Sequence, residues 1–174
     1  MATDEGRSFI SHNRSETPYM AGFFAAVIMT LLAHFLGWLG FQVPSFETLY
    51  GSIWNDRVPP ESFSRLWWLG LVTHLVLATY VYSTVSEYVL EFLGRVRSYW
   101  VRGIALGSVF WLFQEMILRP IAGEGFFSSQ LPQAASLVIL SFVLWSIYGV
   151  LYERLNRDGE GEGLLVRDEH GQAA

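Results

Sequence analysis

Four apolar segments of this chain are each long enough to cross a lipid bilayer. The hydrocarbon core of a bilayer is about 30 Å thick, so a helix that rises about 1.5 Å per residue needs roughly 20 residues to span it. The segments of that length are residues 19–39, 66–85, 101–121 and 131–152. Composition agrees, because 52% of the 174 residues are apolar and 16% are aromatic, which places the chain outside the ordinary soluble class. We therefore predict an all-α integral membrane protein with four transmembrane helices in a bundle.

The predicted transmembrane domain, residues 19–152, lies between two polar tails. Residues 1–18 form a polar segment, and we expect the first helix to begin at Thr17 and Pro18, since a hydroxyl can cap free N–H groups and proline suits a first turn. Residues 153–174 are glycine-rich, charged and aperiodic. Such a segment buries too little apolar surface to fold, so we predict a disordered tail.

The arginines predict the orientation. The chain has eleven basic residues and all are arginine; the positive-inside rule places the side that carries more of them in the cytoplasm. We therefore expect both termini and the 86–100 connection in the cytoplasm, in a multi-pass protein. The eight arginines on the predicted cytoplasmic side are Arg7, Arg14, Arg95, Arg97, Arg102, Arg154, Arg157 and Arg167, and the three on the other side are Arg57, Arg65 and Arg119.

The first outer loop, residues 41–64, has a pattern of its own. Apolar side chains recur at helical spacing behind Ser45, which predicts a short amphipathic helix at the outer interface. We favour a lid that packs on the bundle over a surface that binds a partner. Ser64 is the predicted cap of the second span. The apolar residues of the pattern are Phe46, Leu49, Tyr50, Ile53 and Trp54.

Three ionisable residues inside the spans lie at a similar depth. His34, His74 and Glu115 are placed some 9 to 12 Å below the outer boundary at about 1.5 Å per residue. Gln114 shares the level of Glu115, and Ser141 in the fourth span can reach it. A charge stranded in hydrocarbon costs about 2.5 to 3.5 kcal/mol on insertion scales, so these groups should face the bundle interior.

Two interpretations of Glu115 stay open. Glu115 and Arg119 are four residues apart, so they can pair along one helix face while the arginine reaches the interface. Alternatively, Glu115 contacts another helix as part of an intramembrane polar cluster with Gln114, Ser141 and Arg119.

Three functions can be built on these residues. In the first, His34 and His74 are axial ligands of haem b in an electron-transfer protein. In the second, His34, His74 and Glu115 bind a divalent metal or relay protons. In the third, which we favour, the polar residues are structural, no cofactor is bound, and the protein is an accessory or scaffold subunit that contacts the lipid bilayer and other membrane subunits or further copies of itself.

Other classes of function lack their sequence features. The chain has no cysteine, which excludes disulfides, thiolate metal sites and cysteine nucleophiles. It contains no GxSxG, HExxH, P-loop or dinucleotide-binding fingerprint, so we lean against an enzyme. A formal charge of -5 without any arginine-rich run argues against nucleic acid as a partner.

Three short motifs resemble an uncharacterised family of four-span prokaryotic membrane proteins, classed as a domain of unknown function. They are THLVLATYVY in the second span, RPIAGEGFF after the third and SIYGVLYE in the fourth. Just before the Tyr-Gly pair, where the family pattern leads us to expect a histidine, this chain has Trp145. The resemblance implies the fold and a prokaryotic cell (inner) membrane, and it implies no known activity. The matching positions are His74, Pro120, Gly123, Gly125, Phe126, Tyr148 and Gly149.

Overall fold

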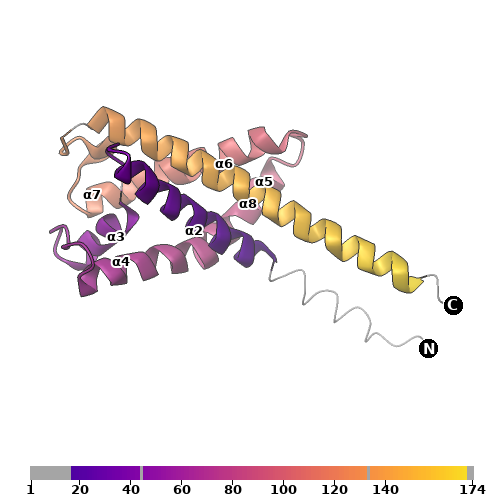
Figure 1. Ribbon diagram of the computed structural model, residues 1–174. Coiled ribbons are helices and arrows are strands. Elements are labelled where there is room, and N and C mark those ends of the chain that lie inside the picture. Colours follow the sequence, from indigo (N-terminus) through magenta and orange to yellow (C-terminus); the bar gives the residue numbers. More distant parts are fainter. Residues whose placement is uncertain (1–16, 44, 133, 172–174) are drawn as a thin grey trace.

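The computed structural model describes residues 17–43, 45–132 and 134–171, with side chains described as far as residue 157. Within these residues all regular secondary structure is helical. Four helical stretches are long and apolar enough to cross a membrane, which confirms the predicted four-span fold (Figure 1). They are Thr17–Trp38, Arg65–Phe92, Tyr99–Ile121 and Ala134–Arg157.

The first two spans differ in regularity. The first is the single helix α2 (Thr17–Trp38), whose first residue is also the first one that the structure describes. The second consists of α4 (Arg65–Val76), the π-helix η1 (Leu77–Tyr82) and α5 (Ser83–Phe92). It runs well beyond the predicted boundary at residue 85, because its last turns are bonded to the fourth span as described below.

The third span is also interrupted by a π-helix. It consists of α6 (Tyr99–Phe113), η2 (Gln114–Leu118) and α7 (Arg119–Ile121). A loop that contains the 3-10 helix η3 (Phe126–Ser128) leads to the fourth span, which is the first part of α8 (Ala134–Gly171).

α8 extends beyond the fourth span to Gly171. The division of the chain into a membrane domain and two tails stays a prediction. Glu153 and Asn156 are 1% and 8% exposed, and Asn156 Nδ2 donates to Glu87 Oε1 of α5 at 3.3 Å, so packing holds α8 at these residues. The predicted polar tail lies outside the described residues except for its last two, which begin α2, and residues 172–174 lie outside them as well.

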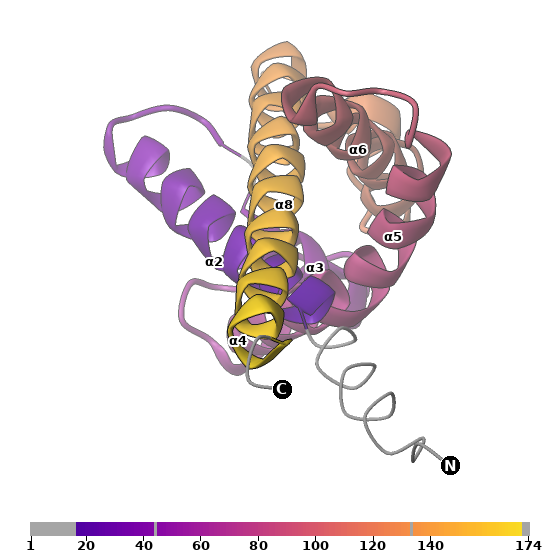
Figure 2. The same ribbon diagram turned by 90° about the vertical axis from the view of Figure 1, so that its right-hand side faces the viewer.

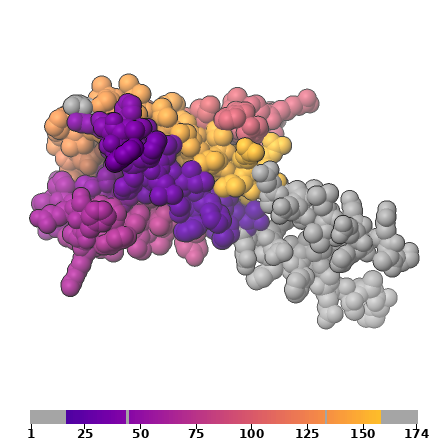
Figure 3. All heavy atoms as spheres, in the orientation of Figure 1, coloured from indigo at the N-terminus to yellow at the C-terminus, as the bar shows by residue number. Residues whose placement is uncertain are grey.

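The start of α2 and the far part of α8 lie at the same end of the bundle, here the terminal end (Figure 1). The segment around residues 45–64 and the start of α8 gather at the opposite end, here the loop end (Figure 3). α8 is the central helix, because it packs along both α2 and α6 (Figure 2).

The short helix α3 (Phe46–Trp54) confirms the helix predicted in the first loop. Its cap is the predicted one, since Ser45 Oγ accepts from Thr48 N at 3.2 Å. One face of the helix is buried against the bundle, because Phe46 and Tyr50 are at most 1% exposed. Packing on the bundle, the interpretation that the sequence favours, is therefore what the structure shows.

Two glycines let α3 and α4 approach closely. A Cβ at Gly70 would lie 2.0 Å from Glu47 O and 2.7 Å from the backbone N of Gly51. The predicted cap of α4 is also present, because Ser64 Oγ accepts from Trp67 N at 3.2 Å. α4 therefore starts in register with α3 and holds it against the bundle.

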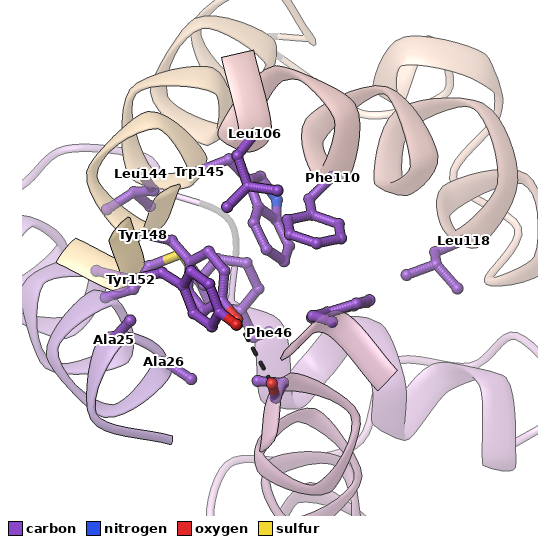
Figure 4. Packing of buried hydrophobic residues seen from close by; sticks show 14 of the residues in the cluster. Ala25, Ala26, Phe46, Leu106, Phe110, Leu118, Leu144, Trp145, Tyr148 and Tyr152 are labelled. Atoms are coloured by element: carbon purple, nitrogen blue, oxygen red, sulfur yellow. Dashed lines mark hydrogen bonds between the residues drawn. The ribbon is translucent and has the colours of Figure 1, made fainter. Parts of the chain in front are cut away.

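α6 and α8 meet through glycines as well. A Cβ at Gly149 would lie 2.0 Å from Gly103 O and 2.7 Å from Gly107 N, so the GxxxG pair of α6 receives Gly149 of α8 at backbone distance. Small residues permit this approach in membranes, where packing replaces the hydrophobic effect as the force between helices. Next to this contact the rings of Phe110, Trp145 and Tyr148 converge in the core (Figure 4).

Gly149→Ala should destabilise the protein by about 1 to 3 kcal/mol, because the added methyl overpacks a backbone contact and forces α6 and α8 apart. Gly37→Ala in α2 is the matched control, since its Cβ would meet only Val43 Cγ2 at 3.6 Å. Thermal unfolding in detergent, followed by tryptophan fluorescence, measures both variants. Equal effects of the two substitutions would refute the role of the glycine contact.

Candidate functional site

The polar residues predicted in the third and fourth spans meet in one buried cluster at the loop end. We call it the Glu115 cluster; it comprises Gln114 and Glu115 on η2, Arg119 on α7, Ser128 on η3 and Ser141 on α8. Each of the five is at most 2% exposed. The sequence proposes all of them except Ser128.

The Glu115 carboxylate accepts hydrogen bonds from four side chains. Its Oε1 accepts from Arg119 Nε at 2.9 Å, from Ser141 Oγ at 2.9 Å and from Gln114 Nε2 at 3.3 Å. Its Oε2 accepts from Ser128 Oγ at 3.2 Å. Glu115 therefore makes both contacts that the sequence leaves open, the local pair with Arg119 and the contact with another helix.

Gln114 and Glu115 both point inward although they are neighbours in the chain. Successive residues of an α-helix are about 100° apart around the axis, given 3.6 residues per turn. Here the two residues begin the π-helical turn η2, and both are 0% exposed. Such turns are rare and frequently mark functional sites. In this chain the turn accompanies two adjacent polar groups on the inner side of one helix.

Two tryptophans, one of the third span and one of the fourth, complete the polar contacts. Trp145 Nε1 donates to Gln114 Oε1 at 2.9 Å, and Trp111 Nε1 donates to Ser141 Oγ at 3.1 Å. Trp145 stands where the family pattern leads us to expect a histidine. The indole supplies the N–H donor that Gln114 needs at this position.

Arg119 joins the cluster to the loop after the third span. Its Nη1 donates to Glu124 Oε2, so the guanidinium lies between two carboxylates. Gly123 and Gly125 have φ of 86° and 77°, a left-handed conformation that suits glycine and turns Glu124 back toward Arg119. Burial raises the pKa of Glu124 above its ordinary value, and the charge of Arg119 opposes that rise.

His34 and His74 have separate surroundings. The side chain of His34 is 52% exposed; its Nδ1 donates to Thr30 O at 2.9 Å, and its Nε2 lies 3.7 Å from Glu47 Oε1. His74 is fully buried and stacks on Phe46, with ring centres 4.6 Å apart. Neither ring nitrogen of His74 has a hydrogen-bond partner among the described residues.

The described residues contain no group of three or more histidine, cysteine, aspartate or glutamate side chains that could hold a metal ion. His34 faces Glu47, His74 faces Phe46, and Glu115 faces Arg119. The metal role of His34, His74 and Glu115 and the haem role of the two histidines stay predictions.

Sequence reasoning misses three contributors to these polar contacts. Ser128 and Glu124 come from the loop after the third span, whose path brings them back to the bundle. Glu47 is 1% exposed and lies on α3, which the sequence places at the interface. Only Glu124 could have been found from the sequence, because its carboxylate follows Arg119 by five residues. The contacts of Ser128 and Glu47 depend on long-range packing.

Comparison of the chain with protein-family models, with curated proteins and with solved structures finds no match. Fold and composition nevertheless define the class: this is a small helical membrane protein with four spans. The resemblance to one particular family stays a hypothesis.

Glu115→Gln should lower the free energy of unfolding by about 3 kcal/mol, because it removes the charge that balances the buried guanidinium of Arg119. We expect a loss at the low end of the range for breaking a buried ion pair, because Glu124 still contacts Arg119 in this variant. Glu61→Gln, at an exposed loop position, is the matched control. Both are measured by thermal unfolding in detergent, and a Glu115→Gln protein as stable as the control would show that the pair contributes nothing.

The raised pKa of Glu124 predicts a pH dependence with a definite sign. A buried acid with a raised pKa gains its proton more readily in the folded state, so its contribution favours folding at acid pH and is lost as pH rises through the raised pKa. Wild type should therefore gain stability relative to Glu124→Gln as pH falls from neutral, measured as the difference in Tm at matched pH. A relative loss would show that the ion pair with Arg119 dominates over burial.

Proposed function

We propose that this protein is an accessory or scaffold subunit of a membrane assembly, without catalytic activity of its own. The observation that supports the proposal is that four internal side chains donate to the Glu115 carboxylate, which is 0% exposed. A carboxylate that transfers protons must be within reach of the group with which it exchanges them. Here the carboxylate links η2, α7, η3 and α8 to one another.

The same cluster explains why a small bundle tolerates charge in its interior. Arg119 and Glu115 are 2% and 0% exposed, and a buried charge is acceptable only when it is paired and hydrogen-bonded. The network holds the loop end of the third and fourth spans in one arrangement. A rigid network of this kind suits a subunit whose task is to present a fixed surface to its neighbours.

We further propose that the protein resides in the prokaryotic cell (inner) membrane with both termini in the cytoplasm. The arginine distribution supports this orientation, and the start of α2 and the far part of α8 lie at one end of the bundle (Figure 1). The lipid bilayer covers the apolar side chains exposed around the spans. The partners are other membrane subunits or further copies of this chain.

One observation favours a second candidate, a ligand role for His74. Its two ring nitrogens lack partners within the described part of the chain although the side chain is 0% exposed. A neutral imidazole is the commonest metal ligand. In this alternative His74 binds haem b together with His34, or takes part in a divalent-metal or proton site with His34 and Glu115.

One preparation tests both candidates. The full chain is tagged, expressed at its natural level and extracted in mild detergent. On a native gel it should migrate above the mass of one chain with its bound detergent. Cross-linking should identify a stoichiometric partner or a second copy of the chain. Glu115→Gln should reduce the assembled fraction, whereas Glu61→Gln should not. A single monomeric species for the wild type would contradict the scaffold proposal.

The absorption spectrum and metal content of that sample test the second candidate. A Soret band that is lost in His74→Ala and in His34→Ala would establish haem, and a stoichiometric metal lost in His74→Ala would establish a metal site. A colourless, metal-free protein would refute both of these roles for His74.

A further inference from the structure

A charged cavity lies at the terminal end, away from the Glu115 cluster. It has a volume of about 680 Å³ and is walled by α5, α6, α8 and the connection between α5 and α6. Three arginines and three glutamates line it, together with Asn156. A cavity of this size matches the pockets that hold small ligands, and its lining offers both signs of charge.

The wall of the cavity is held by contacts between helices. Arg102 Nε of α6 lies 3.2 Å from Glu153 Oε1 of α8. Tyr152 OH donates to Glu87 Oε1 of α5 at 2.8 Å, and Asn156 Nδ2 donates to the same oxygen at 3.3 Å. Three of the helices around the cavity are thus tied together at its floor, which fixes the positions of Asn156 and Glu87.

One buried acceptor in the wall has no donor. Asn156 is 8% exposed, and its Oδ1 has no hydrogen-bond partner among the described residues. A buried acceptor left unpaired costs about 1 to 3 kcal/mol, so a ligand that brings an N–H or O–H group gains by filling the site. Glu91 lines the same cavity and makes no ion pair with another described side chain.

Two arginines of the lining are also available. Arg97 and Arg157 line the cavity, and neither forms an ion pair or hydrogen bond with a described side chain. A guanidinium presents several N–H donors in a plane that matches the oxygens of a phosphate. The cavity therefore combines a place for an anion with acceptors for a group that carries N–H donors.

We propose that this cavity binds a phosphate ester that carries a primary ammonium, the chemistry of a phosphoethanolamine headgroup. Arg97 and Arg157 bind the phosphate. Asn156 Oδ1 and the carboxylates of Glu87 and Glu91 accept from the ammonium. A choline group has no N–H to donate, and a glycerol headgroup has no cation, so the site selects against both. This proposal does not depend on the proposed scaffold function.

The ligand chemistry has two sources, a membrane lipid and a soluble phosphoethanolamine. The cavity lies where the second and fourth spans end and the third begins, and the ends of membrane spans lie at the level of the lipid headgroups in a bilayer. This position favours the lipid. The experiment separates the two by comparing a lipid with its free headgroup.

The test uses the purified full chain in detergent and measures Kd by native mass spectrometry for short-chain lipids of identical acyl length. Phosphatidylethanolamine should bind about tenfold more tightly than phosphatidylcholine or phosphatidylglycerol, the effect of about one charge-assisted hydrogen bond. Arg97→Ala with Arg157→Ala should weaken phosphatidylethanolamine about tenfold or more. Arg65→Ala, an exposed arginine at the loop end, should change nothing.

Asn156→Leu should remove the preference for phosphatidylethanolamine over phosphatidylglycerol. Thermal unfolding checks that each variant is folded. If Asn156→Leu is unstable, Glu91→Gln tests the ammonium contacts in its place. If soluble O-phosphoethanolamine binds as tightly as phosphatidylethanolamine, the site exists and its ligand is the soluble compound. If O-phosphoethanolamine binds at least tenfold more weakly than phosphatidylethanolamine, the ligand is the lipid. Equal binding of the three lipids, or no loss in the double arginine variant, would overturn the proposal.

Discussion

The structure depends on a carboxylate that lies inside a membrane span and is solvated entirely by protein. In hydrocarbon no water is available to Glu115, so its charge persists only if donors reach it from the chain itself. Those donors come from Arg119, from the loop after the third span and from the fourth span. The hydrogen bonds to the Glu115 carboxylate therefore fix the path of the loop and the register of the third span against the fourth. The close glycine contact between α6 and α8 brings the two helices near enough for these hydrogen bonds to form.

The insertion of α3 builds the rest of the loop end on the same helices. Phe46 stacks on His74 and meets the edge of Trp145, and the indole of Trp145 bonds Gln114. The second span is thus connected to the third through an aromatic layer supplied by a loop. Tyr50 adds a buried hydrogen bond to Tyr82 with 2.6 Å between the hydroxyl oxygens. α3 adds bulky side chains to the core of a small four-span bundle, among them Phe46, Leu49 and Tyr50.

The two ends of the bundle have different polar designs. In the Glu115 cluster at the loop end the charges of Glu115 and Arg119 are buried and paired with each other, which favours rigidity over chemistry. At the terminal end the charges line an open cavity, where Arg97 and Arg157 have no partner of their own among the described side chains and Asn156 keeps a free acceptor. The first design supports the proposed role as a membrane subunit, and the second supports the proposed binding of a small polar group.

The sequence by itself determined the features that depend on local spacing and composition. It predicts the four spans and the caps at Ser45 and Ser64, and it offers the pairing of Glu115 with Arg119 as one of two interpretations, because length, capping hydroxyls and a four-residue separation act within one helix. Only the tertiary structure decided that α3 enters the bundle and that Ser128 closes the shell around the carboxylate. These contacts join residues far apart in the chain, and their geometry follows from how the helices pack against one another, which no local pattern encodes.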